Sequence, residues 1–258
     1  MGSMPLSSAV CCTYGRPRLL EEAIQCFLLQ DYQNKELVIV NDLASQRLQL
    51  QTPDPRIRII NLPKRFPCLS SKRNYAVSQC FGDYVFVWDD DDLYLPWRMS
   101  ASVAYLEANT DYDGVKSTEA IYTLDNGAHQ FVTSVFHSQS CFRRSFFDRV
   151  RYEEGLSCGE DWRLEVQAAI AKLDLRPLYW LIYRWGLDIY HISGRGEEDH
   201  SDNWQAAERH AETLGLYDEI LMPRLHHPYW GDVDGFLKFS LAPAAYELWR
   251  CKIAPYLD

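Results

Sequence analysis

Four consecutive aspartates, at positions 89–92, directly follow an aromatic and β-branched run at residues 84–88. Such a run is typical of a buried strand, so the acids stand where that strand ends. Ligands of α/β proteins bind at this edge of the sheet, and carboxylates there can join Mg²⁺ or Mn²⁺ to a phosphate. The alternative is a solvated acidic turn. The apolar residues at 93–96 disfavour that turn, because a purely solvated turn gains nothing from them.

Strand-like and helix-like segments alternate around these acids. In the first half we expect strands at 8–13, 36–40, 56–61 and 84–88, and helices from Arg16-Pro17 and over 70–80. Because three of the strands are continuously apolar, they predict a mostly parallel sheet with helices on both faces. Asn41-Asp42 ends the second strand, so Asp42 is expected beside the acids at 89–92 in the ligand crevice.

The second half of the chain is less regular. We expect a helix over 96–108, a hairpin around Asp125-Asn126-Gly127, a helix from 159 to 173, and strands at 179–184 and 188–191. Glu160 and Asp161 stand in the first turn of the second helix, where acids stabilise the helix dipole. The loop at 194–196 could close over a ligand or be an exposed loop without a role. The tail from 222 is expected to cover an acceptor side or to form a homo-oligomer contact.

Composition limits the classes of function. With 258 residues, 47% of them apolar, the chain can bury the core of one large domain. Its net charge of −10 disfavours nucleic-acid binding, which needs a basic surface. The eight cysteines lack zinc-site spacing and predict buried thiols in a reducing compartment. Because no apolar stretch approaches the roughly 20 residues that span a bilayer and no signal peptide is seen, we expect a soluble, cytoplasmic protein.

Five segments carry a resemblance to a known family: 9–17 (AVCCTYGRP), 38–42 (VIVND), 72–76 (KRNYA), 82–92 (GDYVFVWDDDD) and 159–162 (GEDW). In order and spacing they resemble family 2 glycosyltransferases of the GT-A fold, over residues 8–191. The resemblance implies an α/β, Rossmann-like, mostly parallel sheet flanked by helices, with a smaller mixed acceptor-side region. It divides the chain into a nucleotide-sugar-binding half (4–118), an acceptor and catalytic half (119–221) and a C-terminal extension (222–258).

The activity that the resemblance implies is inverting transfer of a sugar from a nucleotide-diphosphate sugar, with Mn²⁺ or Mg²⁺ and no covalent intermediate. Asp161 matches the general base, and Glu160 is expected to orient the acceptor or the base. Asp91 matches the direct metal ligand, and among the histidines His191 is favoured over His200 as a further ligand. The residues expected at the nucleotide sugar are Thr13, Tyr14, Arg16, Asp42, Lys72, Arg73, Asn74, Asp89 and Asp90.

The chemistry of such a transfer suits these residue types. A metal that bridges two phosphates stabilises the leaving diphosphate, and a carboxylate on the opposite face of the sugar takes the acceptor proton. One alternative is a nucleotidyltransferase, although its usual glycine-rich phosphate loop would stand where residues 14–17 have one glycine. Another is a non-catalytic nucleotide-sugar-binding module. The family alone favours UDP, and the acceptor stays open among a glycan, a small molecule, a protein and a modified nucleobase in DNA.

Overall fold

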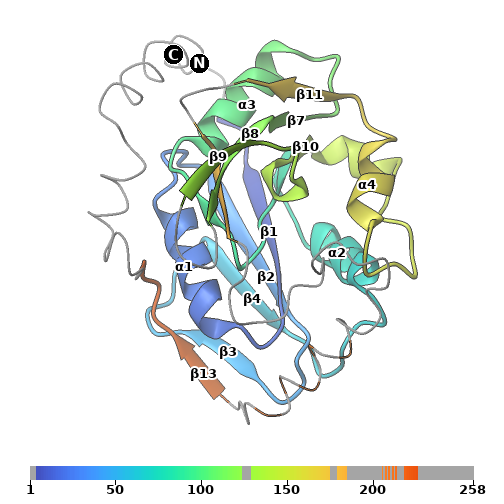
Figure 1. The fold of residues 1–258 in the computed structure, drawn as a ribbon. Helices are drawn as coiled ribbons and strands as arrows, with labels where there is room; N and C mark the ends of the chain where they lie inside the picture. Colours follow the sequence, from blue (N-terminus) through green and yellow to red (C-terminus); the bar gives the residue numbers. More distant parts are fainter. Residues whose placement is uncertain are drawn as a thin grey trace.

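The computed structural model describes residues 4–123, 129–174, 179–184 and 218–225, and single residues between 205 and 213. Its centre is a seven-stranded sheet in the order β11-β7-β10-β5-β1-β2-β4 (Figure 1). The strands are β1 (Ser7–Thr13), β2 (Lys35–Asn41), β4 (Ile57–Asn61), β5 (Tyr84–Val87), β7 (Gly114–Ser117), β10 (Cys141–Arg143) and β11 (Ile170–Leu173). Only β10 runs antiparallel to its neighbours within this sheet, so the predicted mostly parallel α/β sheet is confirmed.

Helices cover both faces of this sheet, as the continuously apolar strands predict. All seven residues of β2 are buried. In β1, Ala9 and Cys11 face the core shared with α1 (Pro17–Leu28) and α3 (Arg98–Ala108), whereas Val10 faces the core shared with α2 (Leu69–Ser78). Figure 1 shows α1 on one side of the sheet and α2 with α4 (Glu160–Glu165) on the other. The period of two along each strand therefore divides the core between the two helical layers.

Two smaller sheets complete the described part. The four-stranded sheet has the order β6-β12-β8-β9, with β6 (Leu93–Tyr94), β8 (Glu119–Thr123), β9 (His129–Thr133) and β12 (Leu181–Arg184). β8 and β9 pair antiparallel, which confirms the predicted hairpin. The third sheet pairs β3 (Arg47–Leu50) with β13 (Asp218–Leu221), and the sequence pattern predicts no strand at 47–50. Two short 3₁₀ helices, η1 (His137–Gln139) and η2 (Arg144–Asp148), flank β10.

The predicted helix from 159 to 173 is wrong in its second half. α4 ends at Glu165, and β11 begins at Ile170 and pairs in parallel with β7. The pairing begins just before the two strands, where the Asp113 N–H donates to the Ala169 carbonyl at 2.8 Å. Several other expectations lie outside the described residues: the strand at 188–191, the loop at 194–196, His191, His200 and the tail beyond 225.

Candidate active site

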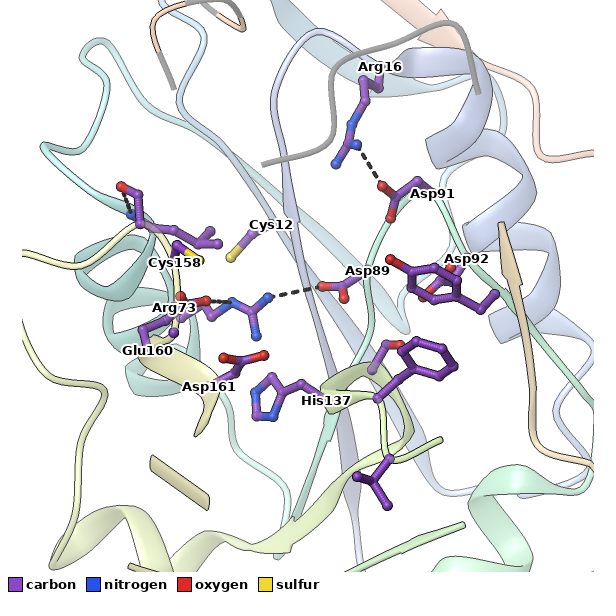
Figure 2. A pocket seen from close by; sticks show the side chains of 17 residues that line it. Cys12, Arg16, Arg73, Asp89, Asp91, Asp92, His137, Cys158, Glu160 and Asp161 are labelled. Carbon is purple, nitrogen blue, oxygen red and sulfur yellow. Dashed lines mark hydrogen bonds and ion pairs between the residues drawn. The ribbon is translucent and has the colours of Figure 1, made fainter. Parts of the chain in front are cut away.

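A cavity of about 320 Å³ opens at the carboxyl ends of β1 and β5. The segment after β5, the start of α4 and η1 contribute most of its polar lining (Figure 2). The lining side chains that the sequence singled out are Arg16, Arg73, Asp89, Asp91, Glu160 and Asp161. The edge of the sheet that the aspartate run pointed to is therefore the edge that carries the cavity.

Two of the four aspartates are turned into the protein. Asp90 is fully buried and accepts hydrogen bonds from Thr13 Oγ1, at 2.6 Å, and from the Arg16 guanidinium. Burial raises its pKa to about 6, although the nearby charge of Arg16 acts in the opposite direction. Asp92 is 2% exposed and accepts a hydrogen bond from the backbone N–H of Arg184 at 3.2 Å. Asp90 therefore packs the end of β5 against β1, whereas Asp92, although buried, lines the cavity.

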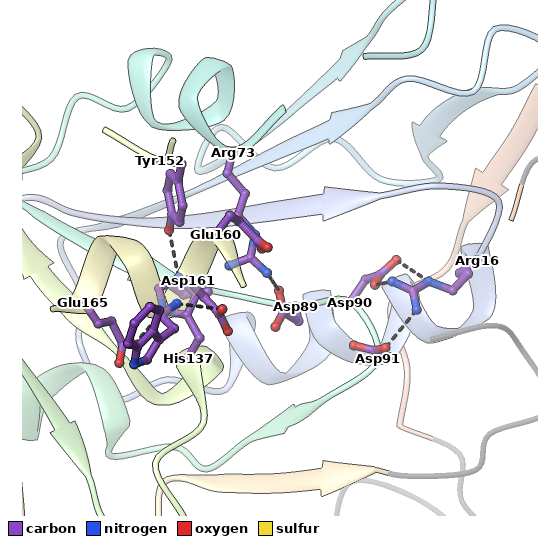
Figure 3. A network of polar contacts seen from close by, with 12 residues as sticks. Arg16, Arg73, Asp89, Asp90, Asp91, His137, Tyr152, Glu160, Asp161 and Glu165 are labelled. Atoms are coloured by element: carbon purple, nitrogen blue, oxygen red, sulfur yellow. Dashed lines mark hydrogen bonds and ion pairs between the residues drawn. The ribbon is translucent and has the colours of Figure 1, made fainter. Parts of the chain in front are cut away.

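The other two aspartates present their carboxylates to the cavity. Asp91 Oδ2 accepts a hydrogen bond from Arg16 Nη1 at 2.8 Å. Asp89 Oδ1 lies 3.5 Å from Arg73 Nη2, and its side chain is 31% exposed. Alternate acids of the run thus point the same way, and each is held by an arginine from another segment of the chain (Figure 3).

The start of α4 supplies the acids on the far side of the cavity. Gly159 takes a φ of 73°, a left-handed conformation that side-chain-bearing residues rarely adopt, and it starts the helix. Glu160 is 3% exposed and its Oε1 lies 3.5 Å from Arg73 Nε. Burial raises the Glu160 pKa, against the lowering effect of Arg73. Asp161 lines the cavity and is half-buried, so it is the more accessible of the two.

Asp42 and Lys72, both expected at the nucleotide, form a buried ion pair that does not line this cavity. Asp42 is 1% exposed and Lys72 is 3% exposed. Lys72 Nζ also donates to the Thr13 carbonyl at 2.7 Å, and Asp42 accepts the backbone N–H of Phe66 at 2.9 Å. The pair therefore ties α2 to the ends of β1 and β2.

Asn74 and Tyr14 also lie away from the cavity lining. Asn74 donates to the Tyr152 carbonyl at 2.8 Å and to Glu154 at 2.9 Å. The Tyr14 ring lies under the Arg65 guanidinium, 4.2 Å from its carbon. These contacts join segments near the site.

Sequence reasoning missed a polar cluster behind the cavity. His137 lines the cavity, and its Nδ1 donates to Glu165 at 2.7 Å while its Nε2 lies 2.9 Å from the Tyr152 hydroxyl. Glu165 also accepts two hydrogen bonds from Lys116. These residues come from four separate segments. The one local signal is the spacing of Glu165, four positions after Asp161 on the same helix.

The residues at the cavity suit a divalent cation that arrives with a phosphate ligand. Within the described ranges, no group of three or more His, Cys, Asp or Glu side chains is arranged to hold a metal by itself. Mg²⁺, however, is commonly held by one or two carboxylates together with substrate phosphates and water. Asp91, with Asp89 beside it on the same wall, supplies such a carboxylate set.

Comparison with known proteins gives the family. The family model described as "Glycosyl transferase family 2" matches residues 8–150. The putative glycosyltransferase EpsE of Bacillus subtilis is 33% identical over 121 residues, which are 45% of this chain and 43% of that protein. The putative colanic acid biosynthesis glycosyl transferase WcaA of Escherichia coli is 37% identical over 111 residues, 41% of this chain and 39% of that protein. The match thus spans less than half the length of either relative.

Solved structures agree on the fold. TarS of S. aureus in complex with UDP superposes with a TM-score of 0.54 at 16% identity, covering 70% of this chain and 61% of that one. The same protein in complex with UDP-GlcNAc gives a TM-score of 0.54 at 13% identity, covering 78% and 64%. Within the described residues, no helix has the length and apolar character needed to cross a membrane. The family match covers more than half of the chain and includes four of the five segments, all but 159–162: this chain belongs to glycosyltransferase family 2.

Proposed function

We propose that the protein is a metal-dependent, inverting glycosyltransferase that uses a UDP-sugar. One observation carries the proposal: a single cavity has Asp91 toward one end and Asp161 toward the other, with Asp89 between them (Figure 2). An inverting displacement needs this separation, because the leaving diphosphate and the attacking hydroxyl stand on opposite faces of the sugar. Family membership supports the transfer reaction.

Each residue has a distinct part in this mechanism. Asp161 accepts the proton of the acceptor hydroxyl as the new bond forms, which increases the nucleophilicity of the oxygen. Arg73 lies between Asp89 and Glu160 and joins the acids after β5 to those at the start of α4. Asp91 would hold the cation. A divalent cation, when bound, neutralises charge on the departing diphosphate without a proton transfer.

The donor and the acceptor are proposed at the level of chemical class. UDP is favoured by the family resemblance and by the UDP and UDP-GlcNAc ligands named for TarS. A glycan acceptor is favoured by the name of WcaA, which refers to colanic acid biosynthesis. One wall of the cavity is aromatic, with the Phe136 and Tyr183 rings stacked at 4.1 Å, and such a wall suits the apolar face of a sugar.

The test is a screen of nucleotide sugars for metal-dependent hydrolysis or transfer. The wild type should turn over a UDP-sugar with Mn²⁺ or Mg²⁺ and lose this activity in EDTA. Asp161→Asn should bind the donor and turn it over slowly. Asp111→Asn, an identical change at an exposed aspartate, is the matched control and should behave as wild type. Tight UDP binding without turnover of any donor by the wild type would favour the non-catalytic module instead.

A further inference from the structure

The helix that carries the proposed base is too short to hold its own orientation. α4 has six residues, Glu160–Glu165, and only Glu160 and Leu164 are buried. Isolated helices of this length are unstable in water, because the cost of the first turn is not recovered. The direction of Asp161 must therefore be set by contacts that α4 makes with the rest of the protein.

The strongest of these contacts are at the last residue of the helix. Lys116 Nζ donates to both oxygens of the Glu165 carboxylate, at 2.9 and 2.7 Å, and Ser140 Oγ donates to one of them at 2.9 Å. His137 Nδ1 lies 2.7 Å from the same carboxylate. Lys116 stands on β7 with a fully buried side chain. The carboxylate is therefore fixed to the central sheet.

The charge state of Glu165 strengthens this attachment. Burial by itself would raise its pKa, but the hydrogen bond and charge of His137 and the charge of Lys116 lower it to about 2. Glu165 is thus ionised at neutral pH, and hydrogen bonds to an ionised group are about twice as strong as neutral ones.

Attachment at Glu165 decides which way Asp161 points. Residues four positions apart on an α-helix lie on the same face, so Asp161 and Glu165 share one side of α4. With Glu165 held against β7, that side faces the cavity, which both Asp161 and His137 line. Figure 3 shows Glu165, His137 and Asp161 gathered at one end of the polar network.

A series of contacts through the same cluster connects Glu165 to the first residue of α4. The Tyr152 hydroxyl is 2.9 Å from His137 Nε2, and the Arg73 guanidinium carbon lies 5.7 Å from the centre of the Tyr152 ring. Arg73 in turn pairs with Glu160 at 3.5 Å. The path Glu165, His137, Tyr152, Arg73, Glu160 therefore runs from the last residue of α4 back to its first.

We propose that Glu165 and His137 are positioning residues for glycosyl transfer. They orient α4 so that the Asp161 carboxylate reaches the acceptor hydroxyl, and they touch neither reacting atom. The inference rests on the proposed function, in which Asp161 is the base.

The test separates positioning from donor binding. Glu165→Gln should bind UDP and Mn²⁺ with near wild-type affinity by calorimetry and lower kcat by about 10²-fold, the scale for a displaced catalytic group. Amide hydrogen exchange of residues 160–166 should become faster in this variant. Glu153→Gln is the matched control, because Glu153 pairs with Arg163 of the same helix at the surface. This variant should change neither kcat nor the exchange rate of residues 160–166.

Further variants keep the proposal falsifiable if Glu165→Gln fails to fold. Glu165→Asp keeps the charge and shortens the side chain by one methylene, and it should also lower kcat while UDP binding persists. His137→Asn keeps one donor toward Glu165 and should retain more activity than His137→Ala. Wild-type kcat in folded Glu165 variants would overturn the proposal, as would a parallel fall of kcat and UDP affinity.

Failure of the proposed function gives a different pattern. If the wild type turned over no donor, or Asp161→Asn kept full turnover, the assignment of the reaction or of the base would be wrong. Hydrogen exchange would then test, without any turnover assay, whether Glu165 anchors α4. Unchanged exchange of residues 160–166 in Glu165→Gln would overturn the anchoring of α4 itself.

Discussion

Replacing Glu165 with glutamine should have a large and pH-dependent effect on stability. The pKa of this carboxyl is about 2 in the folded protein, against an ordinary value of 4.5, because His137 and Lys116 outweigh the effect of burial. At 1.36 kcal/mol per pH unit, this difference corresponds to about 3 kcal/mol of stability at pH 7. The side chain is 19% exposed, so solvent screens the pair only weakly.

The sign of the pH dependence follows from the lowered pKa. A carboxyl whose pKa is depressed by folding stabilises the protein fully above its unfolded value, and this contribution is lost as the pH falls towards the folded value. Glutamine resembles the protonated side chain and lacks this contribution at every pH. The difference in the free energy of unfolding between wild type and Glu165→Gln should therefore be constant from pH 7 to about 5 and about half as large at pH 3.

Urea unfolding followed by tryptophan fluorescence measures this difference at each pH. Glu153→Gln is the control, and its exposed pair should contribute less than about 1 kcal/mol. Adding Lys116→Met to Glu165→Gln should recover part of the lost stability, because the double variant leaves no buried lysine without its partner. A difference below about 1 kcal/mol at pH 7, or one that widens in acid, would refute the reasoning.

Three further substitutions test the site. Asp91→Asn should abolish metal-dependent UDP binding in calorimetry, because an amide is a poor partner for a hard dication, and unchanged UDP–Mn²⁺ affinity would contradict the assignment. Asp161→Asn should leave the donor dissociation constant near wild type and lower the transfer rate by about 10²-fold or more; lost donor binding with intact residual turnover would instead make it a nucleotide or structural residue. Lys72→Met should destabilise the fold by about 3–5 kcal/mol by leaving Asp42 buried without its partner, and a stable variant with weakened UDP binding would assign Lys72 to the nucleotide.

The elements that local sequence specifies were predictable. The apolar run at 84–88 and the acids after it gave β5 and the sheet edge that carries the cavity. Pro17 gave the start of α1, because proline fits the first position of a helix. In these segments the signal lies within a few neighbouring residues, so distant contacts do not have to be known.

The end of α4 could not be read from the sequence. Residues 164–173 keep apolar side chains at spacings that fit a helix, and nothing within the segment marks the change to a strand. The deciding contact is with β7, more than fifty positions earlier in the chain, which pairs with Ile170–Leu173. Tertiary pairing thus overrides a local helical pattern.

The orientation of the acids was beyond sequence reasoning for a similar reason. Asp42 and Asp89 both follow strands of one parallel sheet, yet Asp89 lines the cavity and Asp42 is buried against Lys72. What separates them is the basic residue that α2 brings to each, Lys72 to one and Arg73 to the other. The end of a strand predicts where a carboxylate lies. The basic residue that pairs with the carboxylate decides which way its side chain points.

The charges at the cavity bear on the need for a metal. Burial raises the pKa of Asp92 well above its ordinary value, so the acids of the described lining that carry the charge are Asp89, Asp91, Glu160 and Asp161, against two arginines, Arg16 and Arg73. Both arginines already pair with acids of the same wall. A sugar diphosphate would add negative charge to a site that is already negative, and like charges at short range oppose binding. A divalent cation held by Asp91 would reverse that balance, so donor affinity should depend on the metal even in variants that cannot catalyse transfer.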